Sequence, residues 1–227
     1  MKTLFKKIKY WVQGRVMHKP TLSISQKWIG NHQYGGFYVH TDTLHAESIV
    51  YSIGIGKDIS FDQELIKTFG CKVFGYDPTP KSIAWVTKNV NDKQFKFFDF
   101  GIAKVSGKQS FFLPENKNYV SGSIKPIKGV DRQNKEVLQF KTLKAAMELN
   151  NHTQIDLLKM DIEGAEYEVI DHFLKHKIAI KQFVVEFHPH MEKDGKKKTK
   201  KAIKLLENAG FRCFAVSETF LEYSFIK

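Results

Sequence analysis

Asp161 and Glu163 directly follow a short apolar run of the chain, and Glu186 and His188 lie at the end of the next such run. In an open α/β sheet, ligands lie outside the carboxyl ends of the strands, so these side chains are expected to face one bound substrate. A carboxylate there can accept the proton of an acceptor hydroxyl, with the imidazole as its partner. We predict catalytic roles for Asp161, Glu163 and His188. The structural alternatives are that the two loop carboxylates cap the next helix and that His188, before Pro189, shapes a turn.

The pair Asp161 and Glu163 can instead help to hold a hard divalent cation that lowers the pKa of the hydroxyl. The sequence shows no complete set of oxygen ligands, and two carboxylates alone leave magnesium largely bound to water. We therefore expect a site without a metal.

A second group of residues has the pattern of a site for a nucleotide-like cofactor. The turn Gly54-Ile55-Gly56 ends an apolar run, and its missing side chains let a ligand approach the backbone. Asp77 ends the following run, where a carboxylate can accept hydrogen bonds from both ribose hydroxyls, and Pro78 fixes the turn beneath the adenosine. Asp99 and Phe100 are placed to meet the adenine. Structural roles are the alternative for each: a tight turn for the glycines, a turn cap for Asp77, and core packing for Phe100.

The elements that position these residues alternate between apolar runs and helical patterns, which indicates a parallel sheet covered by helices. Two further runs near the end predict a β-hairpin, the usual end of an adenosylmethionine-dependent fold. The predicted fold is therefore a Rossmann-like, doubly wound α/β fold: a mostly parallel seven-stranded sheet closed by an antiparallel C-terminal hairpin. The predicted strands are Ile49 to Ile55, Lys72 to Tyr76, Phe95 to Ile102 (extended by Gln109 to Leu113), Ile155 to Met160, Gln182 to Phe187, Arg212 to Val216 and Leu221 to Ile226.

Helical patterns separate these runs. A capping box of Ser60 and Gln63 begins one helix, and Gly70 ends it. Residues 121–129 form a polar loop that is either a substrate lid or simply mobile. The other predicted helices are Leu143 to Leu149, Ala165 to Lys175 and Lys200 to Asn208.

One stretch is distinctive enough to indicate a family. Residues 155–170, with the run Lys159-Met160-Asp161-Ile162-Glu163-Gly164-Ala165-Glu166, resemble the strand, acidic loop and helix of FkbM-type methyltransferases. The resemblance extends to Tyr34-Gly35-Gly36, to residues 50–62, to residues 77–80 and to residues 185–188, so it covers the chain from Tyr34 onward.

The resemblance implies that S-adenosylmethionine is the cofactor and that a methyl group passes to a small or carbohydrate-like acceptor, commonly to oxygen, in a biosynthetic pathway. Ser52 stands where many family members carry an acidic residue, and Lys57 and Asp58 interrupt the usual third small residue. Asp58, beside the cofactor loop, is placed to supply the missing carboxylate.

The composition predicts a basic protein with an extension before its main domain. Lysine and arginine (36) exceed aspartate and glutamate (24), giving a net charge of +12, which favours anionic partners. Half of that excess precedes Pro20, where apolar residues recur at helical spacing. We predict a basic amphipathic segment over residues 1–20 and a methyltransferase domain over residues 21–227. The segment either rests on an anionic membrane surface, packs on the domain or remains disordered. Cys71 and Cys213 show no metal-site or disulfide spacing, and no secretory signal or membrane span is evident, so a cytoplasmic protein is expected.

Two other functions fit parts of the pattern. The glycine turn with Asp77 also suits a nicotinamide-dependent oxidoreductase, although the closing hairpin disfavours it. The charge and the 13% aromatic content suit a basic RNA-binding or RNA-modifying protein, but no RNA-binding motif is recognisable, so no specific nucleic-acid partner is expected. The sequence does not determine the oligomeric state.

Overall fold

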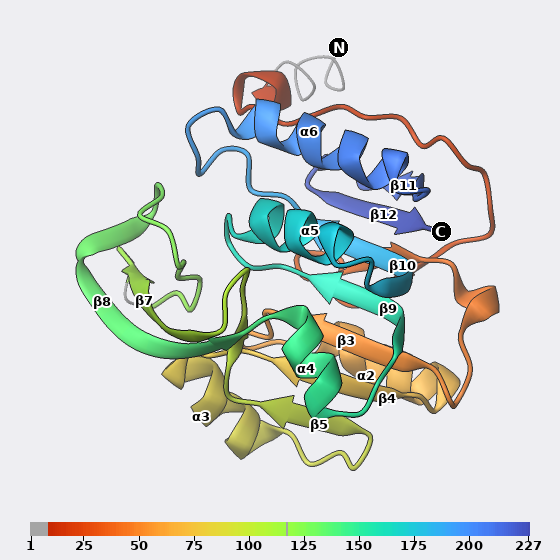
Figure 1. Ribbon diagram of the computed structural model, residues 1–227, viewed down its shortest axis with the longest axis horizontal. Helices are drawn as coiled ribbons and strands as arrows, with labels where there is room; N and C mark the ends of the chain where they lie inside the picture. The colour runs from red at the N-terminus through yellow and green to blue at the C-terminus, as the bar shows by residue number, and fades with distance from the viewer. Residues whose placement is uncertain (1–8, 117) are drawn as a thin grey trace.

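A computed structural model describes residues 9–116 and 118–227. In this part of the chain, seven strands form one sheet in the order β11-β12-β10-β9-β3-β4-β5 (Figure 1). Strand β12 is antiparallel to both of its neighbours, β10 and β11, and the remaining pairings are parallel. This confirms the predicted fold, including the closing hairpin. The strands are β3 (Ile49–Ile53), β4 (Lys72–Tyr76), β5 (Phe95–Phe98), β9 (Gln154–Met160), β10 (Ala179–Glu186), β11 (Arg212–Val216) and β12 (Glu222–Ile226).

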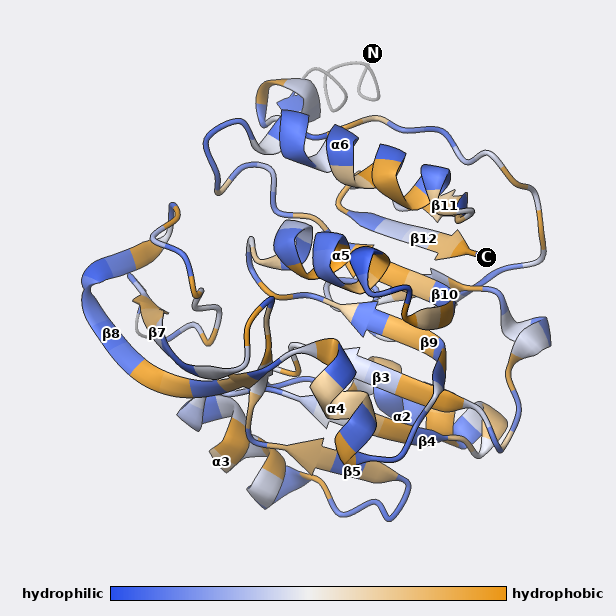
Figure 2. Ribbon diagram, in the orientation of Figure 1, coloured by the Kyte–Doolittle hydropathy of each residue, from blue (hydrophilic) through white to orange (hydrophobic). Residues whose placement is uncertain are grey.

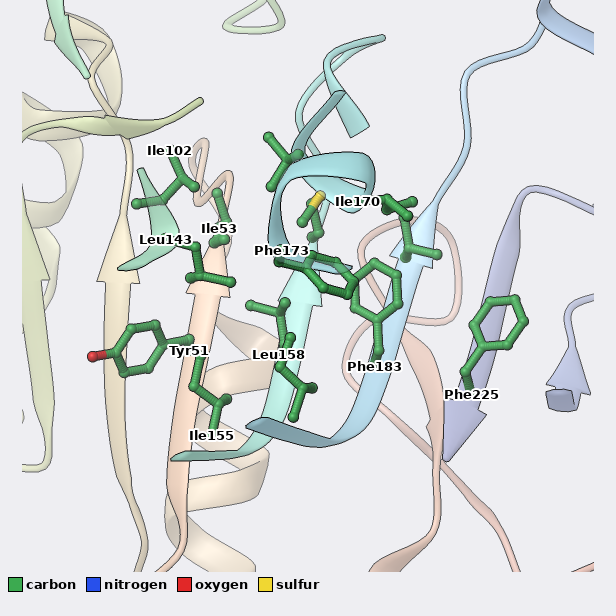
Figure 3. Close-up of a cluster of buried hydrophobic side chains, with 14 of the residues drawn as sticks. Tyr51, Ile53, Ile102, Leu143, Ile155, Leu158, Ile170, Phe173, Phe183 and Phe225 are labelled. Atoms are coloured by element: carbon green, nitrogen blue, oxygen red, sulfur yellow. The ribbon is translucent and has the colours of Figure 1, made fainter. Parts of the chain in front are cut away.

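Helices cover both faces of this sheet, because neighbouring positions of its central strands point to opposite sides. Tyr51 of β3 belongs to one buried cluster, together with residues of α4, α5 and α6, whereas Val50 belongs to a second cluster with residues of α2 and α3. Figure 3 shows the first cluster, in which Phe173 of α5 meets Phe183 of β10 with ring centres 5.3 Å apart. The helices are α2 (Ser60–Phe69), α3 (Pro80–Asn89), α4 (Leu143–Leu149), α5 (Glu166–Lys175) and α6 (Gly195–Asn208).

Three elements before β3 were not predicted. Strands β1 (Lys27–Ile29) and β2 (Phe37–Val39) form a two-stranded antiparallel sheet, followed by the short 3-10 helix η1 (Thr41–Thr43). Ile29, Phe37 and Val39 are fully buried in the cluster on the α2 side. Runs of three residues are too short to show a period in the sequence, so only their packing reveals them.

The predicted third strand proved to be two strands in different sheets. Strand β5 ends at Phe98, and Gly101–Ile102 (β6) pairs with β8 instead. Strand β7 (Gly107–Pro114) does not extend β5 but pairs with the long β8 (Val130–Lys141), which was not predicted. These strands lie at the left of Figure 1, on the side to which β9 points. Figure 2 shows hydrophilic residues along much of β8, and this composition hid it from an analysis based on apolar runs.

The start of α2 differs from the predicted capping box. Ser60 is the first helical residue, and Ile59, which precedes it, offers no side-chain cap. Asp58 acts in its place, since its carboxylate accepts hydrogen bonds from the Ser60 N–H at 2.9 Å and the Ser60 hydroxyl at 2.9 Å. Asp58 therefore has a structural task in fixing the turn that leads from β3 into α2.

The predicted basic amphipathic segment is described only in part, because residues 1–8 lie outside the described residues. Val16 is buried in the cluster around α5 and α6, and its carbonyl accepts a hydrogen bond from the Tyr223 hydroxyl. Trp11 is exposed, and Lys196 of α6 lies 4.6 Å from its ring centre. The second half of the segment thus packs on the domain. Among the described residues, no helix has the length and apolarity needed to cross a membrane.

Candidate active site

A cavity of about 450 Å³ opens beyond the carboxyl ends of β3, β4, β9 and β10. This volume is within the range of small-molecule sites. One side is formed by the glycine turn and Asp77, and the other by the acidic loop after β9 with Glu186 and His188. Residues 120–122 and Ile124 of the long loop between β7 and β8 also line it. The two groups of residues that the sequence singled out therefore face one cavity.

The glycine turn is shaped by a close approach between two loops. Gly54 has a φ of 81°, and a Cβ at this position would lie 1.7 Å from the carbonyl oxygen of Asp161. Only glycine fits there, because any side chain would overlap the backbone of the acidic loop. The turn after β3 thereby sets the position of the loop after β9.

Asp77 is buried and ties the glycine turn to the turn after β4. One of its carboxylate oxygens accepts hydrogen bonds from the N–H groups of Ile55 (3.1 Å) and Gly56 (2.8 Å). The other accepts from the N–H (2.9 Å) and the hydroxyl (2.7 Å) of Thr79. A carboxylate has about four acceptor positions, so Asp77 is fully occupied within the protein.

The other predicted cofactor residues divide into two groups. Ile55, Gly56, Asp58 and Pro78 line the cavity together with Gly54 and Asp77. Asp99 and Phe100 do not belong to the described lining of the cavity: Asp99 is exposed, and Phe100 is buried in the core, 5.5 Å from the ring centre of Tyr76. The chain leaves the main sheet directly after β5, so Gly101 and Ile102 of β6 reach the cavity instead.

A buried pair of opposite charges lies beneath the glycine turn and was not predicted. Lys159 of β9 donates hydrogen bonds to the carbonyl oxygens of Gly54 and, at 3.5 Å, Ile53. Burial raises the pKa of Asp62, on α2, to about 6, against the opposing effect of the Lys159 ammonium and of Ser52. Asp62 thus places a carboxylate beside Ser52 from another element. Asp62 lies in the first turn of α2 beside the buried Phe61, which is the one local signal of its burial.

His188 lies at the centre of a cluster of four carboxylates, which we call the carboxylate cluster: Asp161, Glu163, Glu166 and Glu186. Its Nδ1 contacts a carboxylate oxygen of Glu166, which also accepts a hydrogen bond from the N–H of Gly164 at 3.1 Å. Its Nε2 lies 3.4 Å from Glu163, 3.6 Å from Asp161 and 3.7 Å from Glu186. The structure thus brings together the four residues that the sequence placed at the strand ends, which are Asp161, Glu163, Glu186 and His188.

The charges of this cluster depend strongly on one another. Burial alone lowers the pKa of His188, but the neighbouring carboxylates, Glu166 first and then Glu163, outweigh it and raise the pKa well above its usual value. Burial also raises the pKa of Glu163 and, more strongly, that of Glu186, and in both cases the charge of Asp161 adds to the effect. The surrounding carboxylates thus favour the protonated form of His188.

The geometry disfavours the helix-capping alternative for Asp161 and Glu163, whereas His188 does begin a turn, since its carbonyl oxygen accepts a hydrogen bond from the Met191 N–H at 3.2 Å. Helix α5 begins at Glu166, and neither Asp161 nor Glu163 caps it, because its N-cap residue is Ala165 and has no side-chain cap. Glu163 has a left-handed backbone with a φ of 51°, which is uncommon outside glycine. This strained position directs Glu163 toward His188 rather than along the helix.

The loop between β7 and β8 is attached to the acidic loop by two side chains. The Ser123 hydroxyl donates to the carbonyl oxygen of Glu163 at 2.7 Å, and the Lys125 ammonium donates to that of Gly164 at 2.9 Å. Lys125 also pairs with Glu192 at 3.0 Å. The sequence left two alternatives for this polar loop, a substrate lid or a mobile segment. In this structure the loop covers the carboxylate cluster.

Residues 46–213 match the model of the methyltransferase FkbM domain. Among the solved structures that are similar at low identity are the following three. Methyltransferase FkbM from Methylobacillus flagellatus KT has a TM-score of 0.49 and 10% identity over 81% of this chain, which spans 44% of that protein. The Methanococcus jannaschii fibrillarin pre-rRNA processing protein has a TM-score of 0.49 and 11% identity, over 93% and 86% of the two chains. The N-terminal domain of human METTL16 in complex with SAH has a TM-score of 0.45 and 12% identity, over 79% and 60%. None of the curated proteins matches the sequence.

Proposed function

Because this chain belongs to the FkbM methyltransferase domain family, we propose that it uses S-adenosylmethionine to methylate a hydroxyl group of a small or carbohydrate-like acceptor. The observation that supports this most directly is that a single cavity joins the glycine turn and Asp77 to the carboxylate cluster. A methyl donor bound along the first side would place its reactive carbon near the second. The family and the fold support S-adenosylmethionine as the donor.

The first side of the cavity has the features of a nucleoside site. Gly54 and Gly56 bring bare backbone to the cavity, and Asp77 ends β4 beside them. Because Asp77 already accepts four hydrogen bonds, a ribose must share its oxygens or displace one donor. Thr79 is the donor most easily displaced, since a hydroxyl can rotate away whereas backbone N–H groups cannot.

The second side has groups that can take up a proton. Methyl transfer is an in-line displacement: the acceptor oxygen forms a bond to the methyl carbon, the carbon–sulfur bond breaks, and S-adenosylhomocysteine leaves. The acceptor proton needs a base. With His188 protonated, this base is a carboxylate, Asp161 or Glu163, and His188 holds the carboxylates in place. Burial raises the pKa of Glu163, which makes its carboxylate a stronger base than an exposed one.

Calorimetry with S-adenosylmethionine tests the cofactor side. Asp77→Ala should lose most of the affinity and also about 2 to 4 kcal/mol of stability, because it leaves buried N–H groups of Ile55, Gly56 and Thr79 without an acceptor. Thr79→Val is the matched control, since it keeps the side-chain shape and removes only the hydroxyl, with its hydrogen bonds to Asp77 (2.7 Å) and Ser82 (2.6 Å). It should bind S-adenosylmethionine with nearly the affinity of the natural protein. Equal affinity in all three proteins would refute the role of Asp77.

Transfer of a labelled methyl group identifies the acceptor class. Purified protein is incubated with labelled S-adenosylmethionine and with separate pools of free sugars, lipid-linked saccharides and RNA. Label in a saccharide, released by neither mild base nor protease, supports O-methylation of a carbohydrate-like acceptor. Label in RNA alone would overturn this part of the proposal.

A further inference from the structure

We propose that Asp161, Glu186 and His188 bind one divalent cation at the edge of the cavity, a site that positions the acceptor hydroxyl; this role of the cation rests on the proposed function. Expectation from the sequence was a site without a metal, because no complete ligand set could be recognised along the chain. The structure supplies that set from the ends of two strands, β9 and β10, which are neighbours in the sheet although Asp161 and Glu186 are separated by 25 positions in the sequence.

The spacing of the ligand atoms suits a single ion. One oxygen from each of the two carboxylates and the Nε2 of His188 all lie within 4.8 Å of one another. Nε2 is 3.6 Å from the oxygen of Asp161 and 3.7 Å from that of Glu186. Two ligands that each lie about 2.1 Å from one ion are separated by about 3.0 to 3.7 Å when the angle between them is 90 to 120°. The distances are too long for hydrogen bonds and match this separation.

The histidine is held as a metal-binding histidine usually is. Glu166 is fully buried and engages Nδ1, and the N–H of Gly164 fixes Glu166 in turn. Such a carboxylate behind the ring orients the other nitrogen toward an ion. Only 4% of the His188 side chain is exposed, yet within the described structure its Nε2 makes no hydrogen bond. An oriented imidazole nitrogen that lines the cavity, faces carboxylates and makes no hydrogen bond is placed as a metal ligand would be.

The carboxylates give a second, independent indication. Asp161 Oδ1 and Glu163 Oε2 are buried atoms without a hydrogen-bond partner among the described residues. The ammonium of Lys125, in the neighbouring loop, does not neutralise these oxygens, because it binds Glu168, Glu192 and the Gly164 carbonyl instead. An ion between Asp161, Glu186 and His188 would satisfy the orphaned oxygen of Asp161.

The same geometry gives the ion a function. All three ligands line the cavity. The coordination positions that they leave open on the ion would therefore face the acceptor. An acceptor hydroxyl bound there would have a lower pKa. Glu163, whose free oxygen lies 3.4 Å from Nε2, is then the carboxylate left to accept the proton. The mixture of two carboxylates and one imidazole suits Mn²⁺, which accepts both oxygen and nitrogen ligands.

Titration with Mn²⁺ followed by electron paramagnetic resonance tests the site without any methyl acceptor. The full chain should remove the signal of free Mn²⁺ with one ion per chain. Asp161→Asn and Glu186→Gln should each weaken binding by about 10-fold or more. Glu168→Gln is the matched control, because this carboxylate lies on the neighbouring helix α5 and pairs with Lys125 at 3.2 Å. It should leave Mn²⁺ affinity unchanged.

Two further measurements separate the outcomes. S-adenosylmethionine binding to each variant shows that it is folded, and methyl transfer with and without a chelator tests the link to catalysis. No Mn²⁺ binding up to about 1 mM, the weak end of protein sites for divalent cations, overturns the inference, as does equal affinity in all variants. Mn²⁺ binding that depends on Asp161 and Glu186, without transfer to any hydroxyl, would retain the metal site and refute the proposed function instead.

Discussion

The two sides of the cavity differ in how many hydrogen bonds their buried carboxylates accept. Asp77, on the cofactor side, has every acceptor position filled by backbone N–H groups and one hydroxyl. On the acceptor side, oxygens of Asp161, Glu163 and Glu166 are buried without a hydrogen-bond partner in the described part of the chain. A buried polar group without a partner costs free energy, so the two sides differ in what they need.

The difference shows which carboxylate is complete within the protein itself. Asp77 is, because its hydrogen bonds close between the turns after β3 and β4, although beneath the same turn Asp62 Oδ1 and Ser52 Oγ are buried without a hydrogen-bond partner among the described residues. The carboxylate cluster stores unfavourable charge that a proton on His188 offsets only in part, and it gains from an added cation or an acceptor hydroxyl. Unsatisfied groups of this kind are usual at sites of chemistry. Changes on the cofactor side are therefore expected to reduce stability, and changes in the cluster to reduce activity.

Gly54→Ala should have the largest effect on stability. It forces a Cβ to within 1.7 Å of the Asp161 carbonyl oxygen and places alanine at a φ of 81°. We expect a loss of about 4 kcal/mol or more, measured by denaturant unfolding, together with loss of S-adenosylmethionine binding.

Gly129→Ala is the control for this change. Gly129 also has a left-handed backbone, with a φ of 93°, but nothing lies within 4 Å of an added Cβ. Its replacement should cost only the backbone strain, about 1 to 2 kcal/mol. Equal losses in the two variants would show that the contact between the glycine turn and the acidic loop contributes nothing.

Asp62→Asn should change the pH dependence of stability by an intermediate amount. Burial raises the pKa of Asp62 from its ordinary 3.8 to about 6 in the folded protein. Between these values the unfolded chain releases the proton and the folded chain keeps it, so rising pH lowers the stability of the natural protein until about pH 6. The full contribution is roughly 3 kcal/mol.

The measurement is the difference in unfolding free energy between the natural protein and Asp62→Asn. Below about pH 4 the difference should be constant, and it should move against the natural protein as the pH rises to 6. Using a difference removes the contributions of other acids common to both proteins. A difference that stays level from pH 4 to 7 would contradict the burial of an ionisable Asp62 beside Lys159.

Glu163→Gln should have the smallest effect on stability and a large one on turnover. Glutamine keeps the shape and removes one negative charge from a site that also holds Asp161, Glu166 and Glu186, so stability should change by less than about 1 kcal/mol. Methyl transfer should fall by about 100-fold or more because the base is lost. The melting temperature and kcat are measured on the same preparation.

The structural explanation of Glu163 makes the opposite prediction. If its carboxylate only holds the loop in place, the melting temperature would fall and kcat would remain. That outcome would remove the contrast between the two sides of the cavity. S-adenosylmethionine affinity, which should be unchanged in Glu163→Gln, shows that the variant has kept the cofactor side.

Much of the main sheet could be predicted because its information is local. The bounds of β4, β11 and α4 agree with the predicted ones, since each run is short, apolar or periodic, and bounded by clear stop signals. The sheet of β6, β7 and β8 could not be predicted in the same way. Its strands pair across a long polar loop, and β8 is largely exposed, so neither apolar runs nor alternation marks it.

The site shows the same division. The sequence by itself determined that Gly54, Asp77 and Asp161 stand at strand ends, because the order of strands and turns along the chain requires it. Only the tertiary structure decided that Asp99 and Phe100 turn away from the cavity, that Lys159 and Asp62 are buried together beneath it, and that Glu166 holds the ring of His188 22 positions away. The physical reason is that burial and charge pairing depend on which segments meet in space. A single sequence shows such contacts only where the residues that meet belong to one local motif, such as the acidic loop.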